Sequence, residues 1–267
     1  MKNKVAAPGS LAKNFIVRLF NIYTTRMRRL TNGAPKSAEE ILDPLDARFR
    51  SILLSMYRGE PQPGTDGQIH PIDRTTKISP SQGMWLYDLC VSIKPKATLE
   101  IGMAYGYSTM FFIAAAAKNQ LGHHTAIDPF QRSRWQGIGL AHAQALTSTT
   151  TSDSFRFIED RSDRAAVDLG RSDSIFEVIF IDGNHRFDDV LVDFYLYAPL
   201  CAVGGYIVFD DIWMRSIQTV VAFVRANRAE FVEVPVGQSN IRVFRKVRRD
   251  ARSWRHFRKF DVSRSSN

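Results

Sequence analysis

Short apolar runs alternate with amphipathic segments between residues 83 and 247. Apolar runs such as Val178–Ile181 are typical of strands buried on both faces of a parallel sheet, and the segments between them have helical spacing. The alternation predicts an α/β fold: a Rossmann-like, seven-stranded, mostly parallel sheet with helices on both faces and a C-terminal antiparallel hairpin, preceded by N-terminal helices. The expected strands are 97–102, 125–128, 155–159, 178–182, 206–210, 231–235 and 241–247, and the expected helices include 84–93, 107–119, 187–202 and 216–227.

Residues 1–66 lack this alternation and are expected to form an N-terminal helical extension. Apolar side chains at helical spacing predict a basic amphipathic helix over residues 11–30. A second helix is expected over about residues 43–58, with Asp43 as its N-cap and Pro44 as its first helical residue. A basic amphipathic helix can lie on an anionic membrane surface, but an apolar stripe more commonly packs against its own domain or a second subunit.

The rest of the chain divides into a main domain at residues 67–248 and a basic tail at residues 249–267. Glycine and proline punctuate residues 59–82, which predicts a long loop that could serve as a lid or linker. Cys90 and Cys201 both fall within expected helices among apolar neighbours. We expect two reduced core thiols, as is typical of a cytoplasmic protein.

The net charge of +9 resides at the two ends of the chain. Residues 1–30 hold seven Lys and Arg and no acid, and residues 241–260 hold nine against Asp250 alone. The body is therefore mildly acidic, and basic ends by themselves do not favour a nucleic-acid partner. The longest apolar run, Met110–Ala117, is far shorter than the about 20 residues of a membrane-spanning helix. With no secretory signal visible, we expect a cytoplasmic location, with residues 1–30 as the candidate for peripheral membrane contact.

Three carboxylates stand at the ends of two expected strands: Asp182 ends the first, and Asp210 and Asp211 end the second. The carboxyl ends of parallel strands form the ligand-binding edge of an open α/β sheet, so these acids are expected to converge. Because like charges repel, they need a cation, hydrogen-bond donors or a substrate. An all-oxygen ligand set suits Mg²⁺ or another hard divalent cation. The alternative is a metal-free site whose acids bind the substrate directly.

The segment Glu100–Ser108 has the pattern E-x-G-x-x-x-G-x-S at an expected strand-to-helix turn. Gly102 permits a tight turn and close approach of a ligand, and the helix N-terminus after Gly106 offers N–H groups to an anion. The spacing departs from the G-x-G-x-x-G of dinucleotide sites and favours a ligand with both an ammonium and a carboxylate. One βαβ step later, Asp128 can accept hydrogen bonds from ribose hydroxyls. A tight turn without a ligand is the alternative.

These motifs, together with Ile181–His185 and Gly204–Asp211, resemble those of class I S-adenosylmethionine-dependent methyltransferases. The resemblance is closest to the metal-dependent O-methyltransferases, which include catechol and caffeoyl-CoA O-methyltransferases and bacterial sugar and antibiotic O-methyltransferases. It covers about residues 77–247 and leaves out the N-terminal extension and the basic tail. It implies S-adenosylmethionine as the cofactor and a small-molecule hydroxyl as the methyl acceptor, such as a catechol-like compound, a sugar or a glycosylated metabolite.

The resemblance also implies a role for each matched residue. Asp182, Asp210 and Asp211 would hold the cation. His185 stands where catechol-type relatives carry a lysine, and because histidine titrates near neutrality it can take the acceptor's proton, with Asp182 as its catalytic partner. Alternatively, His185 merely caps the expected helix 187–202. The residues implied to bind the cofactor are Glu100, Gly102, Gly106 and Ser108 at its methionine part, Asp128 at the ribose, Arg161 and Ser162 at the adenine, and Ile78 in a loop that closes over it. Tyr107 and Asp182 are also implied to contact the cofactor.

Three other interpretations remain open on the sequence alone. One is a metal-independent methyltransferase of the same fold. Another is an enzyme that methylates nucleic acid, which is disfavoured because no Asn/Asp-Pro-Pro-aromatic run for base methylation is present. The third is a membrane-surface or assembly protein that keeps the fold without catalysis, against which the intact acids argue. A homodimer could bury the apolar stripe of residues 11–30.

Overall fold

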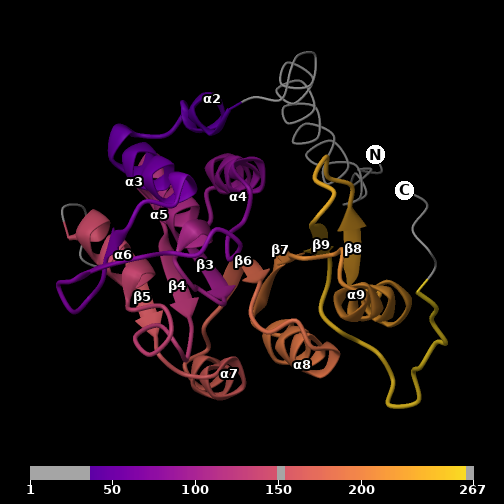
Figure 1. The fold of residues 1–267 in the computed structure, drawn as a ribbon. Helices are drawn as coiled ribbons and strands as arrows, with labels where there is room; N and C mark the ends of the chain where they lie inside the picture. The colour runs from indigo at the N-terminus through magenta and orange to yellow at the C-terminus, as the bar shows by residue number, and fades with distance from the viewer. Residues whose placement is uncertain (1–36, 149–153, 263–267) are drawn as a thin grey trace.

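A mixed sheet of seven strands runs through the molecule, which we describe from a computed structural model over residues 37–148 and 154–262 (Figure 1). In their order across the sheet, the strands are β5 (Phe155–Ile158), β4 (His123–Ile127), β3 (Ala97–Ile101), β6 (Phe176–Ile181), β7 (Cys201–Phe209), β9 (Arg242–Lys246) and β8 (Phe231–Val234). Strand β9 is antiparallel to β7 and β8, and the other neighbouring pairs are parallel. This topology confirms the predicted Rossmann-like sheet with its C-terminal hairpin.

The chain reverses its direction across the sheet between β3 and β6. After β3 it moves outward to β4 and β5, and it then returns to place β6 against the free side of β3. Open α/β sheets bind ligands at such a switch point, outside the carboxyl ends of the strands. The backbone N–H of Asp182, just after β6, donates to the carbonyl of Ile101 at the end of β3 (3.0 Å). The glycine motif and the first acid therefore meet at this point.

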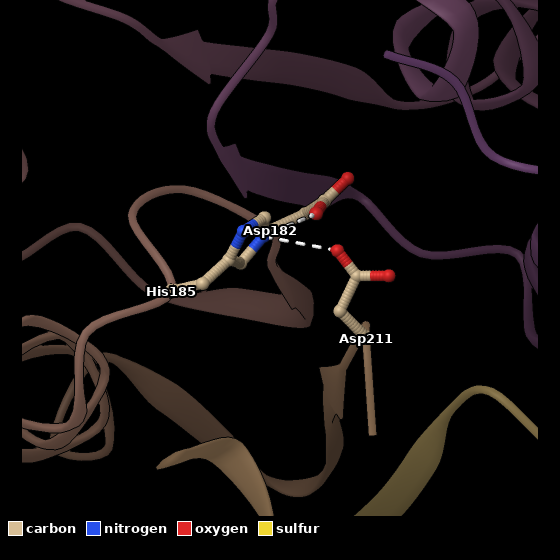
Figure 2. Close-up of side chains that lie close together, drawn as sticks. All are labelled: Asp182, His185 and Asp211. Atoms are coloured by element: carbon tan, nitrogen blue, oxygen red, sulfur yellow. Dashed lines mark ion pairs between the residues drawn. The ribbon is translucent and has the colours of Figure 1, made fainter. Parts of the chain in front are cut away.

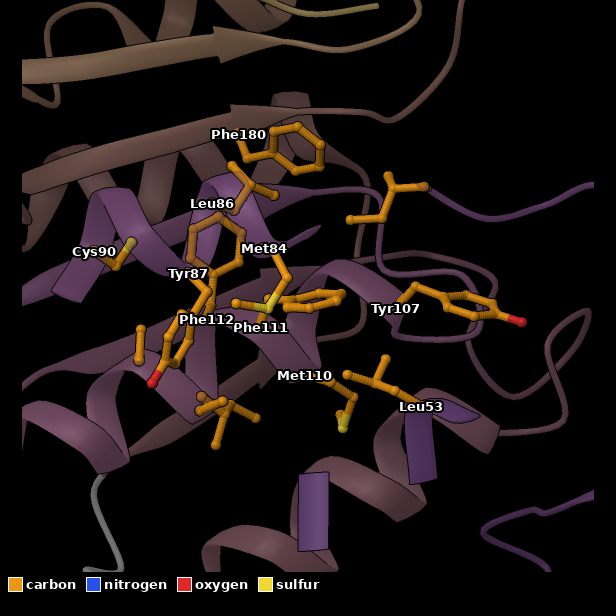
Figure 3. Packing of buried hydrophobic residues seen from close by; sticks show 14 of the residues in the cluster. Leu53, Met84, Leu86, Tyr87, Cys90, Tyr107, Met110, Phe111, Phe112 and Phe180 are labelled. Atoms are coloured by element: carbon orange, nitrogen blue, oxygen red, sulfur yellow. The ribbon is translucent and has the colours of Figure 1, made fainter. Parts of the chain in front are cut away.

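Helices cover both faces of the sheet (Figure 1). Along β6, Val178 and Phe180 face one hydrophobic core and Ile179 and Ile181 face the other, because successive strand side chains point to opposite faces. Phe180 packs near Phe112, with ring centroids 6.1 Å apart (Figure 3). The first core lies among α2 (Ala38–Leu42), α3 (Ala47–Arg58), α4 (Pro80–Ile93), α5 (Tyr107–Asn119) and α6 (Ile138–Thr147), and the second among α7 (Ser162–Arg171), α8 (Phe187–Tyr197) and α9 (Arg215–Asn227).

The second predicted helix begins later than expected. Asp46, and not Asp43, is the N-cap of α3, because its side chain accepts the backbone N–H of Arg48 (3.0 Å). Asp43 instead ends α2, a short helix that the sequence pattern did not predict and that Ser37 opens with a capping box. Both α2 and α3 contribute buried residues to the same core as α4 and α5, so residues 38–58 pack directly on the main domain.

Two further helix boundaries differ clearly from the prediction, and a proline explains each. Helix α4 begins at Pro80 instead of residue 84, since Pro80 occupies the first helical position after the N-cap Ser79, where its missing N–H costs nothing. Helix α8 ends at Tyr197, ahead of Pro199, and Cys201 therefore lies in β7 and not in a helix. Both cysteines are buried free thiols. The long loop before α4 contains a small antiparallel ribbon, β1 (Gln62–Pro63) and β2 (Ile69–His70).

The C-terminal tail is described as far as residue 262 and forms neither helix nor strand after β9. It runs along α9, where Asn227 exchanges two hydrogen bonds with the backbone of Arg258 (2.9 and 2.7 Å) and Phe260 packs edge-on against Phe223. The predicted helix over residues 11–30 lies outside the described residues. Among the helices that the structure does describe, none is both long and apolar enough to cross a membrane.

Candidate active site

Three polar side chains meet at the carboxyl ends of β6 and β7 (Figure 2). Asp182 directly follows β6, His185 lies three residues further in the loop to α8, and Asp211 follows β7. The imidazole Nε2 of His185 lies 3.1 Å from Asp211 Oδ2 and 3.6 Å from Asp182 Oδ1. One potential ligand atom from each residue lies within 4.8 Å of the other two. We call this group the acid–histidine cluster; all three residues are partly exposed.

Asp210 does not belong to the cluster, contrary to the prediction that all three acids converge. Asp210 is only 3% exposed, and its Oδ1 accepts hydrogen bonds from Gln82 Nε2 (2.9 Å), Asn240 Nδ2 (3.0 Å) and the backbone N–H of Asp211 (2.8 Å). Within the described residues, the structure therefore brings His185 into the predicted ligand set in place of Asp210.

Hydrogen bonds fix the two loops that carry the cluster. Asp211 Oδ1 accepts from Trp213 Nε1 (2.9 Å) and Asn240 Nδ2 (3.1 Å), which leaves Oδ2 directed at His185. The backbone carbonyl of His185 accepts from the hydroxyl of Ser216 at the start of α9 (2.6 Å). Asp211 has a left-handed backbone with φ of 50°, which is uncommon outside glycine. Its side chain is thus held in place by donors from two separate segments.

The cluster carries an excess of negative charge. Burial is the main cause that raises the pKa of Asp182 and of Asp210, and the charges of neighbouring acids raise both further. The proximity of Asp182, and then of Asp211, raises the pKa of His185 above its ordinary value of 6.5. Yet His185 Nε2 is buried and makes no hydrogen bond of good geometry with any described residue. A cation placed among these groups would lower the electrostatic repulsion between the two carboxylates.

The glycine motif lies directly beside the cluster. Gly102 has φ of 89°, and a Cβ at this position would lie 2.1 Å from the backbone oxygen of Asp182. Gly106 has φ of 84°, and its Cβ would lie 2.7 Å from the Cα of Gly139 in α6. Both positions therefore require glycine, as the motif predicted. In the described residues no side chain caps the N-terminus of α5 after Gly106, so its N–H groups are available to an anionic ligand.

Glu100 and Ser108 are placed differently from the expectation that they contact a ligand directly. The Glu100 side chain is fully buried, and it accepts hydrogen bonds from the hydroxyls of Ser108 (2.5 Å) and Thr109. His124 Nε2 lies 3.1 Å from the same carboxylate. The network ties β3 to the first turn of α5 from inside the core. Glu100 thus supports the glycine loop from within the protein.

Tyr107 also points into the core. Its hydroxyl donates to the backbone carbonyl of Met56 in α3 (2.8 Å), and its side chain is 4% exposed (Figure 3). Asp128 braces the glycine loop, because its carboxylate accepts the backbone N–H groups of Met103 (3.1 Å), Ala104 (2.8 Å) and Phe130 (2.8 Å). Each carboxylate oxygen can accept more than one hydrogen bond, so a bond from a ribose hydroxyl to Asp128 stays a prediction.

The other predicted cofactor contacts lie around the same edge of the sheet. Arg161 and Ser162 follow β5 at the start of α7, where Arg161 forms an ion pair with Asp163 (3.0 Å). Ile78 immediately precedes the N-cap of α4 and is 5% exposed, and its carbonyl accepts the hydroxyl of Tyr57 (3.1 Å). Their contacts with a cofactor stay predictions.

Sequence reasoning missed three side chains that contact the strand-end acids: Gln82, Trp213 and Asn240. Gln82 carried a signal, because Ser79 and Gln82 have the S-x-x-Q spacing of a capping box. Trp213 and Asn240 carried none, since their contacts depend on how two loops fold over the end of β7.

Comparisons with known proteins agree with this fold. Residues 99–212 match a family model described as a methyltransferase domain. The uncharacterized protein y4gI of Sinorhizobium fredii (strain NBRC 101917 / NGR234) is 26% identical over 143 residues, a match that spans 50% of this chain and 15% of that relative.

Two solved structures share the fold. The methyltransferase PaMTH1 of Podospora anserina with bound SAH has a TM-score of 0.57 and 15% identity, covering 78% of this chain and 93% of that one. An O-methyltransferase from Bacillus cereus in complex with SAH has a TM-score of 0.54 and 17% identity, covering 78% of this chain and 95% of that one. At these identities the likeness is one of fold.

Proposed function

We propose that this chain, whose residues 99–212 match a family model described as a methyltransferase domain, is a class I S-adenosylmethionine-dependent enzyme that transfers a methyl group to a hydroxyl oxygen of a small molecule with the help of a divalent cation. The acceptor would carry a second oxygen beside the reacting hydroxyl, as a catechol-like compound, a sugar diol or a glycosylated metabolite does. The observation that carries the proposal is the acid–histidine cluster of Asp182, His185 and Asp211 lying beside the glycine loop.

The donor site is supported by the environment of that loop. The uncapped N-terminus of α5 suits the carboxylate of the methionine part. Asp182 adjoins Gly102, so its negative charge would attract the ammonium and sulfonium groups of the cofactor. When bound, S-adenosylmethionine would supply the methyl group from a positively charged sulfur. An acceptor oxygen in line with the S–CH₃ bond would bond to the methyl carbon, and the sulfur would leave as the neutral thioether of SAH. The protein contributes chiefly by holding the two reactants in contact.

The chemistry of the cluster fits a divalent cation. Asp182 and Asp211 each present a carboxylate oxygen toward His185, which is the basic group that pairs with them within residues 37–148 and 154–262. Oxygen ligands favour Mg²⁺, Mn²⁺ or another hard divalent cation. A bound cation would lower the pKa of the acceptor hydroxyl and fix its position. In this proposal Asp182 and Asp211 hold the cation.

His185 is the proposed proton acceptor. Asp182 and Asp211 raise its pKa, which makes the neutral imidazole a stronger base, and the ring is partly exposed. The hydrogen bond from Ser216 to the backbone carbonyl of His185 keeps the loop against α9. In its neutral form His185 would take the hydroxyl proton as the oxygen attacks the methyl group.

Transfer of a labelled methyl group tests the proposed function. The purified chain would be incubated with S-adenosylmethionine carrying a radiolabelled methyl group, Mg²⁺ and a panel of catechols, sugar diols and glycosylated metabolites. We expect an O-methylated product for at least one class of vicinal diol. Label appearing only on nitrogen or carbon acceptors, or tight cofactor binding with no transfer to any member of the panel, would contradict the proposal.

We also propose a cytoplasmic location and small-molecule partners, without a nucleic acid. Residues 1–30 would provide a peripheral membrane contact or a homodimer interface, as their basic and apolar residues suggest. Sedimentation with anionic liposomes and gel filtration, each with and without residues 1–30, separate the two. Binding that is lost on truncation while turnover persists would identify a membrane contact.

A further inference from the structure

We infer that Asn240, in the turn between β8 and β9, is a positioning residue that holds the two acids after β7 in the arrangement the cation requires. This inference rests on the proposed function. A single amide group, Asn240 Nδ2, donates to Asp210 Oδ1 (3.0 Å) and to Asp211 Oδ1 (3.1 Å). The backbone carbonyl of Asn240 accepts from the N–H of Ile212 (3.0 Å). Side chain and backbone together therefore clamp residues 210–212.

The two carboxylate oxygens of Asp211 make different contacts. Oδ1 is occupied by Asn240 and by the indole N–H of Trp213 (2.9 Å). Oδ2 lies 3.1 Å from His185 Nε2 and faces the cluster. Asp211 is thus prepared to offer one oxygen in a fixed direction. Carboxylates that bind metal ions are commonly oriented by such hydrogen bonds, and losing them weakens binding about 10- to 100-fold.

The same clamp reaches the start of α4 through Asp210. Gln82 Nε2 donates to the Asp210 oxygen that Asn240 also contacts (2.9 Å), while Gln82 Oε1 accepts the backbone N–H of Ser79 (3.0 Å). Ser79 follows Ile78, the residue expected to close over the cofactor. Asp210 therefore links the end of β7, through Gln82, to the start of α4 beside Ile78.

Binding of Mn²⁺, measured by electron paramagnetic resonance on the full chain without cofactor or acceptor, tests the inference. Asn240→Ala removes the donor and Asn240→Leu removes it with little change in volume. Both should weaken Mn²⁺ binding about tenfold or more, with SAH affinity changed by less than about twofold because no bond to the glycine loop is lost. Asn227→Ala is the matched control: Asn227 is 1% exposed and bonds to Arg258 of the tail, and its loss should leave Mn²⁺ affinity unchanged.

Trp213→Phe gives a second variant should both Asn240 variants fail to fold. Trp213 is 70% exposed, so this change removes one donor to Asp211 with little loss of packing, and Mn²⁺ affinity should fall measurably. Unaltered Mn²⁺ affinity in the folded Asn240 variants overturns the inference. If those variants do not fold, unaltered Mn²⁺ affinity in Trp213→Phe overturns it. A loss of Mn²⁺ affinity in Asn227→Ala equal to that in the Asn240 variants also overturns it. Absence of Mn²⁺ binding by the unsubstituted chain overturns both the inference and the cation in the proposed function, whereas binding unaffected by these variants overturns the inference alone.

Discussion

The backbone oxygen of Asp182 occupies the space that a side chain at Gly102 would need, only 2.1 Å from where its Cβ would stand. The end of β6, which carries the first acid, is therefore pressed against the loop that follows β3. A donor bound along that loop and an acceptor held at Asp182 would be neighbours without any movement of the sheet. In the proposed function, this contact would bring the methyl donor and the acceptor together.

Replacing Gly102 with alanine should disrupt this contact. The added Cβ would clash with Asp182 at a backbone φ of 89°, and the strained conformation alone costs about 1–2 kcal/mol. We expect a loss of at least about 2 kcal/mol in the free energy of unfolding and the loss of detectable SAH binding by calorimetry.

Gly170→Ala is the matched control for that experiment. Gly170 lies in α7, and a Cβ added there would meet nothing within 4 Å. The substitution should raise the free energy of unfolding by about 0.5–1 kcal/mol, because alanine favours the helix. A Gly102→Ala protein that matched the unsubstituted chain in stability and SAH affinity would contradict the close approach described above.

Tyr107→Phe distinguishes a core role from a cofactor contact. The Tyr107 hydroxyl donates to Met56 in the buried interface between α5 and α3, so its removal should lower the free energy of unfolding by about 1 kcal/mol in urea denaturation. The affinity for SAH should be unchanged. Tyr195→Phe is the control. Because Tyr195 is 67% exposed, this substitution should change neither the free energy of unfolding nor the affinity for SAH. Weaker SAH binding with unchanged stability would restore Tyr107 to the cofactor site.

The pH dependence of turnover tests the role of His185. Because Asp182 and Asp211 raise its pKa above 6.5 and only the neutral imidazole can accept a proton, kcat/KM should rise as the pH increases through a pKa above that value. Raising Mg²⁺ from a subsaturating to a saturating concentration should move this rise to lower pH, since a nearby cation disfavours the imidazolium. His185→Gln should remove the rise and lower kcat by about 10²–10⁴-fold. An unchanged pH profile in His185→Gln would exclude His185 as the base.

Much of the fold could be predicted because a strand buried on both faces appears in the sequence as a continuous apolar run. The run Val178–Ile181 is apolar throughout because its alternate residues face two separate cores, and such runs fix the strands and the position of the acids after them. Element boundaries were harder. Asp43 and Asp46 are both competent caps, and in the structure Asp43 is the C-cap of α2 while Asp46 is the N-cap of α3.

The site was predictable only in part, for a similar reason. The sequence places Asp182 and Asp211 at strand ends, but which of Asp210 and Asp211 turns toward the cluster depends on donors far away along the chain. Gln82 lies 128 positions from Asp210, and Asn240 approaches from the β8–β9 turn. No local pattern encodes these contacts. Glu100 likewise matches its motif, and only the fold shows that Ser108, Thr109 and His124 surround its carboxylate.

The central claim is that methyl transfer depends on a divalent cation held by Asp182 and Asp211. Measuring turnover with and without the cation tests it most directly. Turnover of an accepted diol would be measured after EDTA treatment, after Mg²⁺ is restored, and in Asp182→Asn and Asp211→Asn variants whose folding is verified by thermal denaturation. We expect activity to vanish with EDTA, to return with Mg²⁺, and to require a higher Mg²⁺ concentration in both variants. Turnover that is indifferent to EDTA and retained in both variants would contradict the central claim.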